Sequence, residues 1–191
     1  MLIGITGGIG SGKSTIAAEL CRRGYPIYDT DRAAKHIIVH NPAVRSQVEV
    51  LFGSEVFDGD IYRTDLVAQA VFQNHDLLMR LNAVVHPAVA FDLKHWYHIQ
   101  KSTFCFVESA ILYNSELYAL CGKVIEVTAP DAVRIARTMT RDNVSRDKVL
   151  ARINAQNDAP HPQADYRINN DGTSSVPSLV DGIETALKSF L

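Results

Sequence analysis

The sequence predicts a three-layer α/β/α protein built on a mainly parallel sheet, and three observations support this. Short apolar runs alternate with segments whose apolar residues recur at helical spacing. A glycine-rich stretch joins the first apolar run to the first helical segment. A long, largely helical stretch separates the second apolar run from the third, which predicts an insertion into an otherwise alternating fold.

The elements of the sheet layer follow in chain order. Apolar runs of strand length occupy 1–6, 25–28, 104–107 and 123–128, and 165–169 is expected to form a last short strand. Helical patterns occupy 14–23, 131–140, 146–156 and 176–191, and Gly24 ends the first of them. Strands that alternate with helices favour parallel pairing, because each crossover helix returns the chain to the same edge of the sheet.

The inserted stretch predicts helices near 31–40, 43–52, 64–73, 75–85 and 87–100. A turn at 58–60 interrupts them. Pro87 predicts the break between the last two helices, because the residue before a proline is biased away from helical backbone. Such an insertion is where a substrate-side subdomain would lie.

The composition excludes several protein classes. The chain has 191 residues, 47% of them hydrophobic and 21% charged, with a formal net charge of -2. This balance is ordinary for a globular protein and argues against a polycationic nucleic-acid binder. No apolar run has the ~20 residues of a membrane-spanning helix, and the first residues do not resemble a secretory signal. Three widely spaced cysteines favour reduced thiols, so we expect a cytoplasmic protein.

Residues 4–15, GITGGIGSGKST, carry the strongest functional signal. Gly7 to Ser14 fits G-x-x-x-x-G-K-[ST], and the flanking strand and helix are the context that this motif requires. Backbone amides in such a loop form a nest for phosphate, and the helix dipole adds to it. Lys13 would reach the β- and γ-phosphates, and the Ser14 hydroxyl would ligate Mg²⁺. The alternative is a glycine-rich turn that binds nothing. The fold class is therefore refined to a P-loop NTPase-type protein.

The segment YDTD, residues 28–31, lies at the expected carboxyl end of the second strand, where ligands bind in parallel sheets. In extended backbone Asp29 and Asp31 would point the same way. One would accept a proton from an attacking hydroxyl, and the other would help to hold metal-bound water. The alternative is that one aspartate only caps the following helix.

A third signal is a group of arginines. Arg137 and Arg141 share one helix face and would clamp a polyphosphate. Arg134, Arg146 and Arg152 fit a solvated basic face equally well. The polar, turn-rich segment RTMTRDNVSRDK predicts a lid that closes over the nucleotide.

Taken in order, these motifs resemble the dephospho-coenzyme A kinase family. The resemblance covers about residues 2–172 and rests on six segments of the printed sequence: GITGGIGSGKST, YDTDRAAK, DGDIYRTDLVAQAVF, LNAVVHP, VTAPDAVRIARTMTRDNVSRDKVLARINAQ and RINNDG. It implies transfer of the γ-phosphoryl group of ATP to the ribose 3′-hydroxyl of dephospho-CoA, the final step of coenzyme A synthesis. One departure is VESAILYNS, where Asn114 stands near a position that is acidic in many members, while Glu108 lies just before it.

The resemblance also implies a division of the chain and roles for its residues. The nucleotide-binding core would be 1–31 plus 104–136 and 157–191, the helical CoA-side domain 32–103, and the lid 137–156. The loop residues Gly10, Ser11, Gly12, Lys13, Ser14 and Thr15 would bind the phosphates of ATP. Asp31 would be the base, with Lys13 and Arg137 in the chemistry, and Arg141 and Asn170 would lie near the nucleotide. We expect Asp29, Arg63 and His86 on the substrate side, although His86 fits a structural role better than a chemical one.

Two rival functions remain open at this point. Another small P-loop kinase, acting on a nucleoside monophosphate or shikimate, would share the loop but not LNAVVHP. A nucleotide-dependent switch would hydrolyse slowly without an acceptor, and no N-K-x-D motif for guanine is present. We expect ATP and Mg²⁺ as cofactors, and dephospho-CoA as the small-molecule substrate. We expect no nucleic-acid or membrane partner, and a monomer or weak homo-oligomer.

Overall fold

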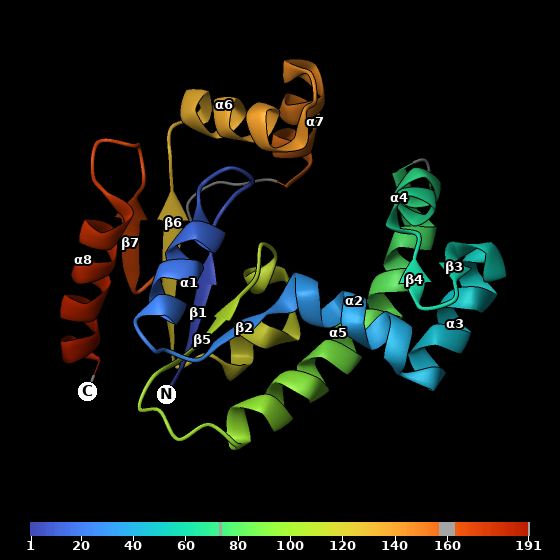
Figure 1. Ribbon diagram of the computed structural model, residues 1–191, viewed down its shortest axis with the longest axis horizontal. Coiled ribbons are helices and arrows are strands. Elements are labelled where there is room, and N and C mark those ends of the chain that lie inside the picture. The colour runs from blue at the N-terminus through green and yellow to red at the C-terminus, as the bar shows by residue number, and fades with distance from the viewer. Residues whose placement is uncertain (73, 157–162, 191) are drawn as a thin grey trace. The chain divides into compact units, whose positions relative to one another are not determined.

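The computed structural model describes residues 1–72, 74–156 and 163–190 (Figure 1). It divides into two compact units, Met1–Tyr28 with Gln100–Leu191, and Asp29–Ile99. The expected ends of two helices, at 73 and 191, and the first part of the expected core segment 157–191 lie outside the described residues. The expected three-part division with a lid at 137–156 stays a prediction.

The first unit holds a five-stranded sheet in the order β2-β5-β1-β6-β7. Its strands are β1 (Leu2–Thr6), β2 (Ile27–Asp29), β5 (Cys105–Glu108), β6 (Lys123–Thr128) and β7 (Tyr166–Asn169). The central strand β1 pairs in parallel with β5 and β6, and β6 pairs in parallel with β7. The predicted α/β class with a mainly parallel sheet is confirmed, and the carboxyl ends of these strands meet at one edge.

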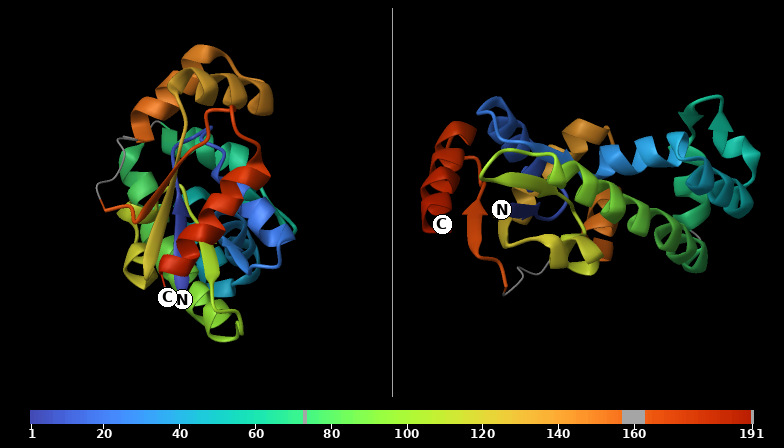
Figure 2. Two further views of the ribbon diagram at one scale, coloured as in Figure 1. Left: turned by 90° about the vertical axis from the view of Figure 1, so that its left-hand side faces the viewer. Right: turned by 90° about the horizontal axis from the view of Figure 1, so that it is seen from below.

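The core lies between this sheet and two helices, α1 (Lys13–Arg22) and α8 (Val176–Ser189). Ile5 and Phe106 from the sheet pack with Ile16 of α1 and Ile183 of α8, and all four are fully buried. These residues point to one face of the sheet and come from one face of each helix, so hydrophobic burial favours this arrangement. Figure 2 shows the two helices along the same face of the sheet.

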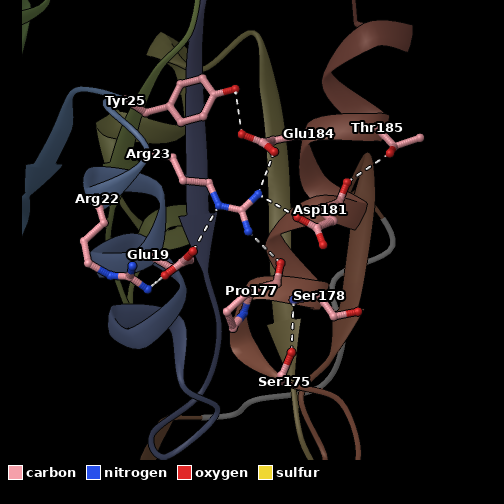
Figure 3. A network of polar contacts seen from close by, with 10 residues as sticks. All are labelled: Glu19, Arg22, Arg23, Tyr25, Ser175, Pro177, Ser178, Asp181, Glu184 and Thr185. Atoms are coloured by element: carbon pink, nitrogen blue, oxygen red, sulfur yellow. Dashed lines mark hydrogen bonds and ion pairs between the residues drawn. The ribbon is translucent and has the colours of Figure 1, made fainter.

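An ion-pair network joins α1 to α8 beside this core (Figure 3). Arg23, which follows α1, donates to Glu19 at 3.0 Å, to Asp181 at 2.7 Å and to Glu184 at 2.6 Å. Its remaining contact is with the carbonyl oxygen of Pro177 at 2.8 Å. One guanidinium therefore ties the end of the first helix to the first turns of the last.

Two helices follow β6 at the edge where β1 and β6 end (Figure 1). They are α6 (Asp131–Asp142) and α7 (Arg146–Gln156), and Ile135, Val149 and Ile153 form a small core between them. Asn143 ends α6 in the left-handed region with a φ of 51°. The segment between β5 and β6 carries the short 3₁₀ turns η2 (Leu112–Asn114) and η3 (Glu116–Leu120).

The second unit consists mainly of helices, as the sequence predicts. It contains α2 (Thr30–His40), α3 (Pro42–Phe52), α4 (Thr64–Phe72) and α5 (His75–His98). The expected turn at 58–60 is the tip of a hairpin that the sequence analysis missed, with strands β3 (Phe57–Asp58) and β4 (Ile61–Tyr62) after the 3₁₀ turn η1 (Ser54–Val56). Two-residue strands are too short to produce a periodic signal.

The predicted helix break at Pro87 is wrong, because α5 runs through it as one 24-residue helix. Val85, Val89 and Leu93 are buried on one face of α5, which packs against α2, α3 and α4. That burial on both sides of the proline outweighs the loss of one helical hydrogen bond.

Candidate active site

The glycine-rich loop connects β1 to α1 with the geometry that the motif predicts. Gly10 and Gly12 have φ values of 76° and 92°, and residues other than glycine rarely adopt such backbone angles. A Cβ at Gly12 would collide with the side-chain amide of Asn170, and one at Gly10 would lie 2.7 Å from the Thr138 hydroxyl. The glycines therefore serve both the turn and the close approach of later segments.

Helix α1 starts directly at Lys13, and no side chain caps its N-terminus. The amides of Thr15 and Ile16 donate to the carbonyl oxygen of Gly12 at 3.1 Å, and Ser11 N donates to Gly8 O at 3.1 Å. The first amides of a helix and its dipole favour an anion at this end. The loop thus has the form of a phosphate cradle, with Lys13 half-buried beside it.

Glu108 ends β5 next to this loop, and it is 9% exposed. The Ser14 hydroxyl donates to its Oε1 at 2.5 Å. A hydroxyl and a carboxylate side by side are oxygen donors of the kind that a hard divalent cation takes. The sequence left the choice between Glu108 and Asn114 open; Asn114 is exposed in η2, and the structure brings Glu108 to the loop.

Asn170 and Arg137 lie against the loop at Ser11 and Gly12. The side chain of Asn170, 5% exposed, donates to Ser11 O at 2.8 Å. Arg137 of α6 donates to Asn170 O at 2.9 Å and to Asn170 Oδ1 at 3.3 Å. The structure therefore brings together two residues that the sequence separates by 33 positions, next to Ser11.

Arg141 lies apart from this group. It is 65% exposed and pairs with Asp142 at 2.7 Å, and Arg152 pairs with the same carboxylate at 2.8 Å. These hydrogen bonds hold the pKa of Asp142 below its usual range and raise the pKa of Arg141. The structure does not place Arg141 on the loop.

Arg134 and Gln156 contact the loop at Ile9, and the sequence did not predict either contact. Arg134 is buried, and its Nε donates to Ile9 O at 2.9 Å, so the solvated basic face that the sequence left open for this residue is wrong. Gln156 Oε1 accepts a 2.9 Å bond from Ile9 N. The signal for Gln156 in the sequence is its place as the last residue of the lid segment that resembles the family. Helical periodicity cannot reveal a contact between residues that are 147 positions apart.

Asp29 and Asp31 do not share an extended segment, so that part of the prediction is wrong. Asp29 ends β2 and caps α2, accepting from Arg32 N at 3.0 Å, and Asp31 already lies in the first helical turn. The cap is the alternative that the sequence left open, and it starts the helix one residue too early for extended backbone at Asp31. Both side chains are exposed.

The remaining substrate-side candidates lie in the second unit. Arg63 precedes α4 and pairs with Asp65 at 3.0 Å, a contact that lowers the pKa of Asp65. His86 is half-buried within α5. The residues described in the structure contain no cluster of three His, Cys, Asp or Glu side chains that would hold a metal, and no helix among them is long and apolar enough to cross a membrane.

Comparisons with known proteins agree with these observations. The dephospho-CoA kinase family model matches residues 1–175. The chain is 42% identical over 154 residues to the dephospho-CoA kinase of Porphyromonas gingivalis, covering 81% of this chain and 76% of the relative. It is 31% identical over 198 residues to that of Bacillus cereus, covering 100% and 96%.

Solved structures show the same fold. A Thermus thermophilus protein superposes with a TM-score of 0.82 at 31% identity, covering 100% of this chain and 98% of that one. A Campylobacter jejuni dephospho-CoA kinase gives 0.71 at 24% identity with the same coverage, and a Bacteroides thetaiotaomicron shikimate kinase gives 0.60 at 16%, covering 98% of each chain. The last two identities support the α/β fold alone. From the family match and the curated relatives, the chain belongs to the dephospho-CoA kinase family.

Proposed function

We propose that residues of the phosphate loop, of α6 and of α2 have separate roles in the reaction of this family, the ATP-dependent phosphorylation of dephospho-CoA in coenzyme A synthesis. The protein is a phosphotransferase that uses ATP. The terminal phosphoryl group passes from ATP to the ribose 3′-hydroxyl of dephospho-CoA. The observation that carries it is the Ser14–Glu108 pair at the edge of a phosphate cradle.

The loop binds the phosphates of ATP. The amides from Gly10 to Thr15 surround the negative charge, and the ammonium of Lys13 neutralises charge on the β- and γ-phosphates. Because these groups are fixed by the fold before ATP arrives, little reorganisation is needed as charge develops during transfer.

The donors at this edge fit Mg²⁺. Mg²⁺ takes one or two protein oxygens and completes its shell with phosphate oxygens and water, so the Ser14 hydroxyl and the Glu108 carboxylate suffice. When bound, the ion neutralises charge on the transferred group. Before the ion binds, Glu108 orients the Ser14 hydroxyl by accepting its hydrogen bond.

Arg137 stabilises the negative charge on the phosphoryl group during its transfer, and Asn170 orients the guanidinium of Arg137. Arg141 lies near the nucleotide in the working enzyme, which requires that it exchange its bond to Asp142 for one to ATP. Residues 137–156 then form a lid that excludes water, so that ATP is not hydrolysed.

Asp31 accepts the proton of the 3′-hydroxyl as it attacks. Its place in the first turn of α2 leaves the carboxylate exposed, and α2 belongs to the helical unit that we assign to dephospho-CoA. Asp29, Arg63 and His86 contact that substrate from the same unit. We further propose that the enzyme is a monomer or weak homo-oligomer in the cytoplasm and needs no nucleic acid.

The test is ATP consumption by purified protein with Mg²⁺ and one of four conditions: dephospho-CoA, AMP, shikimate or no acceptor. Turnover with dephospho-CoA alone, with coenzyme A as the product, supports the proposal. Turnover with AMP or shikimate would contradict the assignment of dephospho-CoA as the substrate. ATP hydrolysis that is independent of an acceptor would contradict the assignment of phosphoryl transfer. Added DNA or RNA is expected to leave the rate unchanged.

A further inference from the structure

We infer that Gln156 is a positioning residue for ATP phosphate binding, acting together with Arg134 through the peptide groups of Ile9. The inference rests on the proposed use of the loop as a phosphate cradle. All the groups concerned belong to the first compact unit.

Ile9 lies in the middle of the loop, and both of its backbone polar groups are held by distant side chains. Its N–H donates to Gln156 Oε1 at 2.9 Å, and its carbonyl oxygen accepts from Arg134 Nε at 2.9 Å. The partners are 147 and 125 residues away and come from different helices, α7 and α6. A loop residue gripped on both sides in this way has little freedom to change its backbone angles.

Gln156 also fixes the neighbouring loop. Its Nε2 donates to Ala110 O at 3.2 Å, and Ala110 follows Glu108, the partner of Ser14, after one intervening residue. The amide therefore uses its acceptor on the loop after β1 and its donor on the loop after β5. A neutral side chain with one donor and one acceptor is required for this, and glutamate or methionine meets only part of the requirement.

Arg134 is itself held in place for the task. It is 7% exposed, its Nη1 pairs with Asp131 at 3.2 Å, and the carbonyl oxygen of its own residue accepts from the buried Thr138 hydroxyl at 2.8 Å. A buried guanidinium that reaches both a loop carbonyl oxygen and a carboxylate is a specific arrangement, since burial of an unpaired guanidinium is costly.

The consequence concerns which amides meet the phosphates. Ile9 N–H donates to Gln156 and so points away from a bound phosphate, and the backbone turns at the next residue, Gly10, with a φ of 76°. Gln156 and Arg134 thus set the starting position of the cradle, and they couple it to the two helices that follow β6.

The experiment compares Gln156→Met with Asn154→Met, the same chemical change at an exposed amide of the same helix. We expect Gln156→Met to lower kcat/KM for ATP by about tenfold, mostly through KM for ATP, because misplacing the cradle weakens phosphate binding. KM for dephospho-CoA and the melting temperature stay near those of Asn154→Met. Equal ATP kinetics in the two variants would overturn the inference.

A double-mutant cycle with Arg134→Met tests the shared target. If both side chains act through Ile9, the combined loss in kcat/KM for ATP is smaller than the product of the single losses. Losses that multiply would mean independent roles and would overturn the inference.

Two further measurements remove ambiguity. Should Gln156→Met fail to fold, hydrogen exchange of the Ile9 amide in the wild-type protein decides, because a protected proton supports the bond to Gln156 and free exchange overturns it. ADP affinity is measured in parallel by calorimetry. If the wild type does not phosphorylate dephospho-CoA, the proposed function fails, whereas a selective loss of ADP affinity in Gln156→Met still supports this inference.

Discussion

The hydroxyl of Ser14 donates to Oε1 of Glu108 across 2.5 Å, and this bond links the first turn of α1 to the last residue of β5. The residues are 94 positions apart. They meet because β1 and β5 are parallel neighbours, so that the segments after them leave the sheet at one edge. This pair is the centre of the proposed magnesium site.

Glu108→Gln keeps the shape of the side chain and removes its charge. We expect kcat to fall by about 100-fold or more, since an ionised oxygen at the cation site is lost. ADP affinity measured without Mg²⁺ should change little. The check is steady-state kinetics over a Mg²⁺ titration, with Glu116→Gln, an exposed glutamate of η3, as the control. An unchanged kcat and Mg²⁺ dependence would remove Glu108 from the site.

Asp31→Asn tests the base. We expect turnover to fall by about 100- to 10,000-fold, because an amide cannot accept the proton of the 3′-hydroxyl. ATP affinity should stay within about twofold, because the phosphate cradle is unaltered. Asp58→Asn, at an exposed position in the hairpin of the same unit, is the control. Full turnover in Asp31→Asn would assign the proton to another group.

Arg137 and Arg141 should differ in importance. Arg137→Met removes the guanidinium that contacts Asn170, so kcat/KM for ATP should drop at least about tenfold below that of Arg141→Met. Arg141 is exposed and already satisfied by Asp142, which makes its removal less costly. Steady-state kinetics of both variants provide the comparison, and the reverse ranking would contradict the proposed roles.

The stability of the first unit should depend on the ionisation of Asp165. Burial raises the pKa of this carboxyl, but bonds from Lys123 Nζ at 2.7 Å and Val124 N at 2.8 Å outweigh burial, and its folded pKa is lowered. A carboxyl with a depressed folded pKa stabilises the protein above its unfolded pKa, near 3.9, and this contribution is lost as pH falls towards the folded pKa.

The measurement is urea unfolding of the wild type and Asp165→Asn between pH 7 and pH 3. At pH 7 the free energy of unfolding of the wild type should exceed that of Asp165→Asn by about 1 kcal/mol or less, because the pair is partly exposed. This excess should disappear as pH falls below about 4. A difference in the free energy of unfolding that is still present at pH 3 would show that the charge of Asp165 is not its cause.

Arg23→Met should lower the melting temperature while leaving KM for ATP unchanged. The change removes the cation shared by Glu19, Asp181 and Glu184 (Figure 3), and Glu19 is buried at 4% exposure. Lys188→Met, at an exposed cation of α8, serves as the control, because Arg22 itself pairs with Glu19. Thermal unfolding of both variants decides, and equal melting temperatures would mean that α8 is held by its apolar face alone.

Local patterns were sufficient to predict much of this fold. The glycine loop, the strands of the sheet and most helices follow from short-range spacing and from the conformational limits of glycine and proline. The exceptions are instructive: α5 continues through Pro87, and Asp31 lies in a helix because Asp29 caps it. In both places a contact outside the pattern, burial in one and a hydrogen bond in the other, decides the local structure.

The site was predictable as far as its motifs reach. Lys13, Ser14 and the loop glycines are marked by spacing, but the burial of Arg134 on Ile9 depends on a contact across 125 residues. Arg137 and Arg141 look equivalent in the sequence, and only the fold separates the one beside Asn170 from the one beside Asp142. Periodicity identifies the face of a helix, and tertiary contacts decide what that face meets.

The helical unit, residues 29–99, leaves the sheet at β2 and returns at β5, and these strands are neighbours. The main chain confirms this closeness, since Phe106 N donates to Pro26 O at 2.9 Å. Such an insertion has both its attachment points side by side, so it can be lengthened, shortened or exchanged without cutting the sheet. Under the proposed assignment of dephospho-CoA to this unit, a change of acceptor would require changes in the insertion and none in the strands that carry the phosphate loop.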